Sequence, residues 1–471
     1  MLQGVSFFEP LRRASRLLTN VSVMLAGMAL LTSVSIVPAQ TESPKPKPYA
    51  SINREAINYF GPGREASADL EGPEIKIGIL APLNGSAKIR GEALIQAAEM
   101  ALEDESRGAF DGRKVVLALG DSTGPWGSAS REIVRLVFDE RAVALITFSD
   151  GNLAHLAEQV GNREGVPVLT LSSDSTTTEI NIPWLFRVVP SDDAQARIFA
   201  RNIYDEHRLT KVLLVTEHDH DGRVGGEAFQ KAAREMGAAP PGRVEISAVP
   251  GEFQAALARI KTVSPEALVF WTGPETAERL RERIREDGIR APVYLCLKAA
   301  HESVGLGTHS PRPTDSGLVH EGVWAVSPLG TAPSPTLRDF AQRYAARTGK
   351  SPSLAAAETY DAVRLVIQAV SSAGPNRARV RDRIAKVTNF QGASGTISFD
   401  GAGNARAGLT LSNSSNRAGH CVRGPPRVLK RLPALNRHFA NSESARLRLV
   451  WWAHQDSNLG PTDYESAALT N

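Results

Sequence analysis

Short apolar segments alternate with segments of helical periodicity over most of this 471-residue chain, and this alternation limits the folds open to it. The first unit joins a strand-like run at residues 75–80 (IKIGIL), a polar loop (APLNG) and an amphipathic helix at residues 93–103. Because short β-branched strands separated by helices pair in parallel, the pattern predicts an α/β protein whose sheets are covered on both faces.

The strand–helix units fall into two series that meet at a Pro-Ser-Asp turn. In the first series we expect strands at residues 75–80, 115–119, 143–148 and 168–171, an extended stretch at 184–189, and helices at 128–139 and 153–160. In the second we expect helices at 194–206, 226–236, 253–263 and 275–287 and strands at 211–216, 244–249, 267–271 and 293–297. A third block contains an extended run at 322–326, helices at 336–347, 354–370 and 376–387, and a strand with a turn at 395–401. Two series fit two doubly wound lobes better than one very large sheet.

The N-terminus has the pattern of an export signal. Three arginines precede an apolar stretch at residues 17–37, and the Val-Pro-Ala pattern at residues 37–39 permits cleavage after Ala39. The stretch approaches the roughly 20 residues needed to span a bilayer, so an uncleaved membrane anchor is the alternative. Either interpretation predicts a periplasmic or otherwise extracytoplasmic protein. A Pro- and Lys-rich linker is expected to follow at residues 40–73.

The charge of the chain is uneven. The formal net charge is +3, but residues 414–450 carry eight basic residues against one acid, which leaves the remainder at −4. The body is therefore mildly acidic, and a role in nucleic-acid binding is not predicted. Helical and strand periodicity ends near residue 413, and two interpretations of residues 414–471 stay open: a reading-frame artefact and a disordered basic tail. The only cysteines, Cys296 and Cys421, predict neither a disulfide nor a zinc site.

Polar residues follow two successive strands of the first series. Residues 149–152 (SDGN) follow the third strand and residues 172–176 (SSDST) follow the fourth. In open α/β sheets the ligand lies outside the carboxyl ends of the strands, so these segments are candidate ligand contacts. The alternative is ordinary helix-start and turn chemistry. The first loop, APLNG, matches neither of the glycine-rich phosphate motifs.

The combination of these segments resembles the periplasmic substrate-binding proteins of the branched-chain amino acid ABC-transporter family. The resemblance covers about residues 75–404 and rests, in order, on IKIGILAPLNG…GEALIQAAEMALE, PVLTLSSDS, WLFRVVPSDD, AAAETYDAVRLVIQA and GASGTISFDGAGN. It implies the type I periplasmic-binding fold: two Rossmann-like lobes joined by a three-strand hinge, closing on a ligand. The implied boundaries are residues 74–190 for lobe 1, completed by 326–395, and 191–325 for lobe 2, completed by 396–413. The hinge crossings are expected near 189–192, 325–328 and 395–400.

The resemblance also carries over ligand-binding residues. Ser149 matches the serine that binds the ligand carboxylate, and Ser172 matches the residue whose carbonyl accepts from the ligand ammonium. Asp174 stands where the family has a threonine. The remaining positions are Arg90 at the cleft mouth, where the family has a tyrosine, Lys298 at the place of the acid that pairs with the ammonium, and an aromatic contact near Trp271 and Gly273.

These departures affect the expected ligand. A buried ammonium needs a counter-charge, so Lys298 in place of the acid predicts an anion-preferring cleft, with Arg90 on the opposite wall. An ordinary amino acid stays open, with Asp174 as the partner of the ammonium and Lys298 paired elsewhere.

Two other kinds of chemistry are weakly indicated. Residues 218–221 (HDHD) have metal-ligand residue types, but ligands two residues apart on a loop are weak evidence, and no metal or other cofactor is predicted. A nucleophilic hydrolase is not predicted because Ser149 lacks a G-x-S-x-G turn and His155 is expected to face helix neighbours or solvent.

The sequence therefore predicts an exported, monomeric, non-enzymatic solute-binding protein that takes an amino acid or small organic anion and delivers it to an ABC permease. The alternative is a receptor component of the same fold that reports ligand occupancy to a membrane partner.

Overall fold

A computed structural model describes residues 68–105, 110, 112–124, 126–179, 182–247, 250–300, 322–329, 333–406 and 408–413, and every structural statement below concerns this part of the chain. The predicted signal segment, most of the predicted linker, Cys421 and the basic tail lie outside it. Among the described helices, none combines the length and apolar character that a membrane span requires.

The first sheet consists of five parallel strands in the order β2-β1-β3-β4-β5. Its strands are β1 (Glu74–Ala81), β2 (Lys114–Asp121), β3 (Ala144–Thr147), β4 (Val168–Thr170) and β5 (Leu185–Arg187). The helices that connect them are α2 (Lys88–Glu105), α3 (Trp126–Val134) with a π-helical continuation η2 (Arg135–Asp139), and α4 (Gly151–Glu164). Strand β1 lies between β2 and β3 and is buried at all but two positions, as its apolar run predicts.

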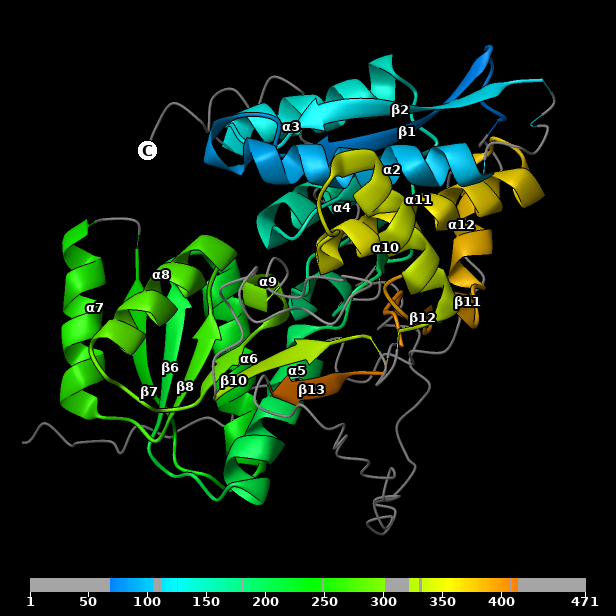
Figure 1. Ribbon diagram of the computed structural model, residues 1–471. Coiled ribbons are helices and arrows are strands. Elements are labelled where there is room, and N and C mark those ends of the chain that lie inside the picture. The colour runs from blue at the N-terminus through cyan, green and yellow to red at the C-terminus, as the bar shows by residue number, and fades with distance from the viewer. Residues whose placement is uncertain are drawn as a thin grey trace, which may run out of the picture. The chain divides into compact units, whose positions relative to one another are not determined.

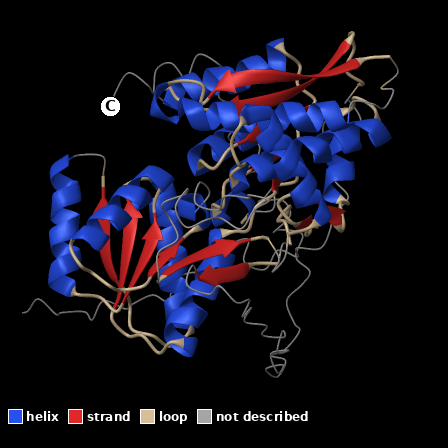
Figure 2. Cartoon of the chain, viewed as in Figure 1, coloured by secondary structure: helices blue, strands red, loops and turns tan. Residues whose placement is uncertain are grey.

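The second sheet has six strands in the order β13-β10-β9-β8-β6-β7. Its parallel strands are β6 (Val212–Glu217), β7 (Gly242–Ile246), β8 (Ala267–Trp271), β9 (Val293–Leu295) and β10 (Val323–Ser327), and β13 (Thr410–Asn413) pairs antiparallel with β10. Its helices are α5 (Asp192–Ala200) with η4 (Arg201–Glu206), α6 (His220–Glu235), α7 (Pro250–Val263), α8 (Pro274–Glu286) and α9 (Leu297–Ala300). Figure 2 shows helices flanking the strands of both sheets.

After β10 the chain returns to the first sheet. Helices α10 (Pro335–Thr348), α11 (Leu354–Ala373) and α12 (Arg377–Ala385) follow, and α11 packs along α2 (Figure 1). Arginines of both helices form ion pairs with α2: Arg343 of α10 pairs with Asp104 at 2.7 Å, and Arg364 of α11 pairs with Glu105 at 2.7 Å. The short strands β11 (Phe390–Gln391) and β12 (Thr396–Ile397) then pair with each other before β13 re-enters the second sheet.

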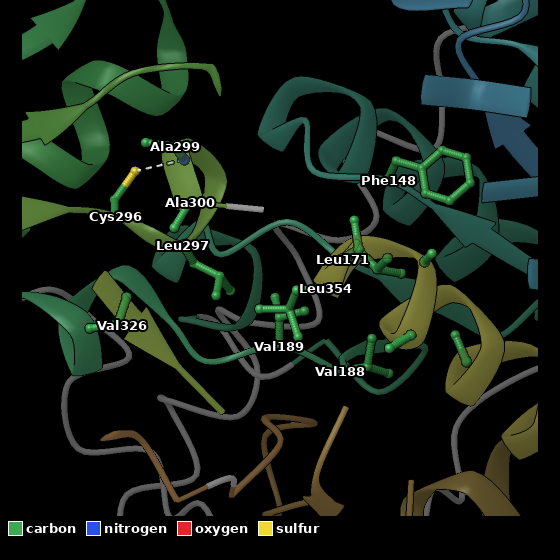
Figure 3. Packing of buried hydrophobic residues seen from close by; sticks show 14 of the residues in the cluster. Phe148, Leu171, Val188, Val189, Cys296, Leu297, Ala299, Ala300, Val326 and Leu354 are labelled. Carbon is green, nitrogen blue, oxygen red and sulfur yellow. Dashed lines mark hydrogen bonds between the residues drawn. The ribbon is translucent and has the colours of Figure 1, made fainter. Parts of the chain in front are cut away.

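A continuous cluster of buried apolar side chains links the strand ends of the two sheets with the segments that connect them. Figure 3 shows part of it: Leu171, Val188, Val189, Leu297, Val326 and Leu354 lie within one group. These residues come from the end of β4, the segment after β5, α9, β10 and the start of α11. The apolar cluster therefore surrounds the points where the chain passes from one sheet to the other.

The predicted fold class is confirmed: two α/β sheets, each with parallel strands connected by helices, are present. Two helices, α2 and α6, begin well before the predicted residue, and α2 starts at Lys88 instead of residue 93. Helix α6 begins at His220 instead of residue 226, because the side chain of Asp219 accepts a hydrogen bond from the Gly222 backbone N–H and caps the helix. The segment interpreted as a loop is thus the first turn of a helix.

Candidate ligand-binding cleft

Helix α4 starts directly after β3 and directs its first backbone N–H groups towards the sheet edge. Its N-cap is Asp150, whose carboxylate accepts from the Leu153 N–H at 3.0 Å. The Gly151 N–H has a partner outside the helix: it donates to Asp221 Oδ1 of α6 at 2.9 Å. A carboxylate at a helix N-terminus is stabilised by the free N–H groups and by the helix dipole.

The other oxygen of Asp221 pairs with Lys298. Lys298 Nζ lies 2.5 Å from Asp221 Oδ2 and 3.9 Å from Asp219 Oδ2. Burial alone lowers the pKa of Lys298, but the two carboxylates outweigh it and raise that pKa, so the side chain is a cation. The charge of Lys298 is therefore balanced by acids of its own surroundings.

Hydrogen bonds to side chains fix the conformation of the segment after β4. Thr170 Oγ1 accepts from the Ser172 N–H at 3.1 Å, and Ser172 Oγ accepts from the Asp174 N–H at 3.2 Å. Arg187, fully buried on β5, donates to the carbonyl oxygen of Asp174. Thr176 closes the turn by donating its N–H to Asp174 Oδ1 at 2.8 Å. Ser172 and Asp174 are consequently both buried, at 1% exposure.

Two imidazoles converge on the remaining oxygen of Asp174. His155 Nε2 lies 3.1 Å and His220 Nε2 lies 2.8 Å from Asp174 Oδ2. Burial would raise the pKa of Asp174, but hydrogen bonds from His155, Thr176 and His220 outweigh it and hold that pKa well below its usual range. The hydrogen bonds to Asp174 and to Glu158 raise the pKa of His155 to about 9.

A cavity of about 230 Å³ lies beside these groups, at the carboxyl ends of the first-sheet strands. Its polar lining includes Arg90, Ser149, Asp150 and Lys298, and its apolar lining includes Leu94, Phe148, Leu153 and Leu171. Arg90 also pairs with Glu275 of α8 at 2.7 Å. A small apolar-walled cavity with a few convergent polar groups is the usual form of a small-molecule site.

The predicted site residues fall into two groups. Arg90, Ser149 and Lys298 line the cavity. Ser172, Asp174, Trp271 and Gly273 are buried next to the strand ends and are absent from its lining. Trp271 is 3% exposed and its Nε1 donates to Asp192 at 3.1 Å, while the Gly273 N–H donates to Glu217 at 2.8 Å.

Sequence reasoning did not place three residues at this site. Asp221 and His220 were considered only as part of the HDHD segment on a loop, although the Asp219 cap is a readable helix-start signal. His155 contacts a helix neighbour, Glu158, as expected, and in addition contacts Asp174, which the sequence did not indicate. His220 joins the same carboxylate from a distant part of the sequence.

Comparisons with known proteins identify the family of the chain. A family model described as "Periplasmic binding protein" matches residues 74–411. The chain is 22% identical over 346 residues to Leu/Ile/Val-binding protein homolog 1 of Brucella abortus, covering 70% of this chain and 87% of that protein. It is 23% identical over 220 residues to an amino acid binding protein of Pseudomonas aeruginosa, covering 46% of this chain but only 59% of that protein.

Solved structures share the fold. A branched-chain amino acid transporter substrate binding protein from Streptococcus pneumoniae, in complex with isoleucine, has a TM-score of 0.61 at 23% identity and covers 74% of this chain and 99% of its own. A solute binding protein of an ABC transporter from R. palustris, in complex with benzoate, has a TM-score of 0.64 at 18% identity and covers 74% and 95%. The fold is therefore the type I periplasmic-binding fold, and the chain belongs to the periplasmic binding protein family.

Proposed function

We propose that this chain is an exported solute-binding protein that takes a small carboxylate-bearing solute, an amino acid or a small organic anion, into the cavity beside Ser149 and passes it to an ABC permease. Binding without turnover is the whole of the proposed activity. The protein acts as a monomer outside the cytoplasm, and closure of the two lobes on the solute signals occupancy to the permease.

One observation carries the proposal: the N-terminus of α4 already holds a carboxylate. Asp221 Oδ1 accepts from the Gly151 N–H at 2.9 Å, next to Asp150 and Lys298, which both line the cavity. The solute's carboxylate would take the place of Asp221 at this N–H and gain the same helix dipole. Isoleucine and benzoate, the ligands of the two similar structures, both carry a carboxylate.

The second end of the solute decides between the two classes. Arg90 and Lys298 are both paired with acids, Glu275 and Asp221, so neither adds a full positive charge to the cavity. A solute ammonium would be attracted by Asp150, which lines the cavity, whereas a neutral or apolar second end would face Phe148 and Leu153. Both classes share the carboxylate contact.

A thermal-shift screen of the full chain tests the proposal. The panel contains the standard amino acids and small aromatic and aliphatic carboxylic acids, each paired with its amide or alcohol, which lacks the carboxylate. We expect at least one acid to raise the melting temperature and its uncharged analogue to leave it unchanged. A panel without any hit, or hits that respond equally to acid and analogue, would refute the proposed function.

A further inference from the structure

Three potential metal ligands from three separate segments meet beside the cavity. They are His155 on α4, Asp174 before the short helix η3 (Ser175–Thr178) and His220 at the start of α6. Their donor atoms, His155 Nε2, Asp174 Oδ2 and His220 Nε2, all lie within 4.8 Å of one another. Within the described part of the chain, no other group of three such side chains comes together.

We propose that His155, Asp174 and His220 bind a divalent transition-metal ion of the zinc type. Two imidazoles and one carboxylate form a ligand set typical of zinc sites, and they disfavour Mg²⁺ and Ca²⁺, which prefer oxygen ligands. Metal–ligand distances of about 2.0–2.2 Å place neighbouring donors a little over 3 Å apart. The two imidazole–carboxylate distances, 3.1 and 2.8 Å, are already close to that spacing.

The surroundings of the cluster support the assignment. Glu158, which is buried, lies 3.3 Å from His155 Nδ1, so a carboxylate orients the ring as in carboxylate–histidine–zinc triads. A Cβ placed on Gly151 would lie 2.5 Å from Asp221 Oδ1 and 2.8 Å from Asp174 Oδ2, so both carboxylates border the space that this glycine leaves open.

The contact of His220 with Arg223 opposes metal binding and therefore allows a test. Arg223 Nη2 donates to His220 Nδ1 at 3.1 Å, and a guanidinium has no lone pair to accept with. His220 then carries its proton on Nε2, the atom that would bind the metal. The Arg223 side chain is 55% exposed, so it can turn away from His220. His220 could then carry its proton on Nδ1 and offer Nε2 to the metal. Removing the Arg223 guanidinium should strengthen metal binding.

The metal would connect parts of the chain that belong to different sheets. His155 and Asp174 follow strands of the first sheet, whereas His220 begins the helix after β6 of the second. A single ion held by all three would stabilise the contact between these segments. This inference goes beyond the proposed function, because it requires no organic solute.

Titration calorimetry of the full chain, stripped with chelator and dialysed, tests the site with ZnCl₂ at fixed pH and with MgCl₂ as comparison. We expect saturation at one zinc per chain and no heat from magnesium. Loss of the orienting carboxylate in Glu158→Gln should weaken zinc binding about 10- to 100-fold, and His155→Gln or His220→Gln should weaken it by at least as much. Arg223→Gln should bind zinc more tightly than the unaltered chain.

His218→Gln is the matched control, because His218 lies two residues from His220 but pairs with Glu245 away from the cluster. It should leave zinc binding unchanged. Circular dichroism melts establish whether each variant folds. If His155→Gln does not fold, the result for His220→Gln, which alters a partly exposed side chain, is used instead. Binding of less than one zinc at saturation, or equal affinity in His220→Gln and His218→Gln, would overturn the proposal. Since no organic solute is present, failure of the proposed function leaves this result unaffected.

Discussion

Asp221→Asn separates the two roles that Asp221 plays in this account. The carboxylate pairs with Lys298 at 2.5 Å and accepts from the Gly151 N–H at 2.9 Å. Asparagine keeps an acceptor for the N–H but removes the negative charge. A hydrogen bond to a charged group contributes about 1.5–3 kcal/mol, so we expect the free energy of unfolding of the chelator-treated, solute-free chain to fall by that amount.

The same substitution should improve solute binding. In the solute-free chain the Asp221 carboxylate competes for the N-terminus of α4, an interaction that typically contributes about 0.3–2 kcal/mol. Without this competitor, a solute carboxylate should bind about 2- to 30-fold more tightly. Lower stability and higher affinity in one variant would not arise from general damage to the fold.

Urea unfolding gives the first quantity, and calorimetric titration with the strongest hit of the thermal-shift screen gives the second. Asp205→Asn is the matched control, because Asp205 is 52% exposed and pairs with Arg208 at 3.8 Å, outside the cavity lining. It should change neither value. If Asp221→Asn bound the solute more weakly, the interpretation of Asp221 as an internal substitute for the solute carboxylate would be wrong.

Three further predictions follow from the contacts described. Gly225→Ala would put a Cβ 1.9 Å from the indole of Trp271, so overpacking should destabilise the chain by about 1–3 kcal/mol in urea unfolding. Gly127→Ala is the control: its Cβ would meet no atom within 4 Å, so it should not destabilise the chain. Burial raises the pKa of Asp361 from its ordinary 3.8 to about 6, so the folded state holds this proton more tightly than the unfolded state does. Relative to Asp361→Asn, the unfolding free energy should therefore fall by up to about 3 kcal/mol as pH rises from about 4 through 6. A difference between the two proteins that stays constant from pH 4 to pH 7 would contradict this cause. Lys298→Glu adds a carboxylate to the cavity and should weaken solute binding at least ~10-fold by calorimetry; unchanged affinity would remove Lys298 from the site.

The periodicity of the sequence predicted the sheets well because a buried strand is itself a run of apolar residues. The run IKIGIL is mostly apolar and forms the interior strand β1. Strand β8 is likewise fully buried over Ala267–Trp271. By contrast β13, Thr410–Asn413, follows no clear alternation and was not predicted, because its position depends on the antiparallel partner β10.

The candidate site was harder to predict because its contacts join residues far apart in sequence. Asp174 and His220 are 46 residues apart, and Gly151 and Asp221 are 70 residues apart. Local patterns place each residue at a strand end or a helix start, but not against its partner. The carry-over by resemblance identified Ser149, Arg90 and Lys298 as neighbours of one cavity, yet it could not indicate that acids already pair with both cations.

The sharpest test of the proposed solute class is mass spectrometry of the small molecules that the purified full chain releases. We expect one compound in near-equal molar amount to the protein, carrying a carboxylate and small enough for a cavity of about 230 Å³. The same compound should rebind after unfolding and refolding, and Lys298→Glu should be purified without it. Release of a stoichiometric compound that has no carboxylate, or undiminished retention in Lys298→Glu, would contradict the account.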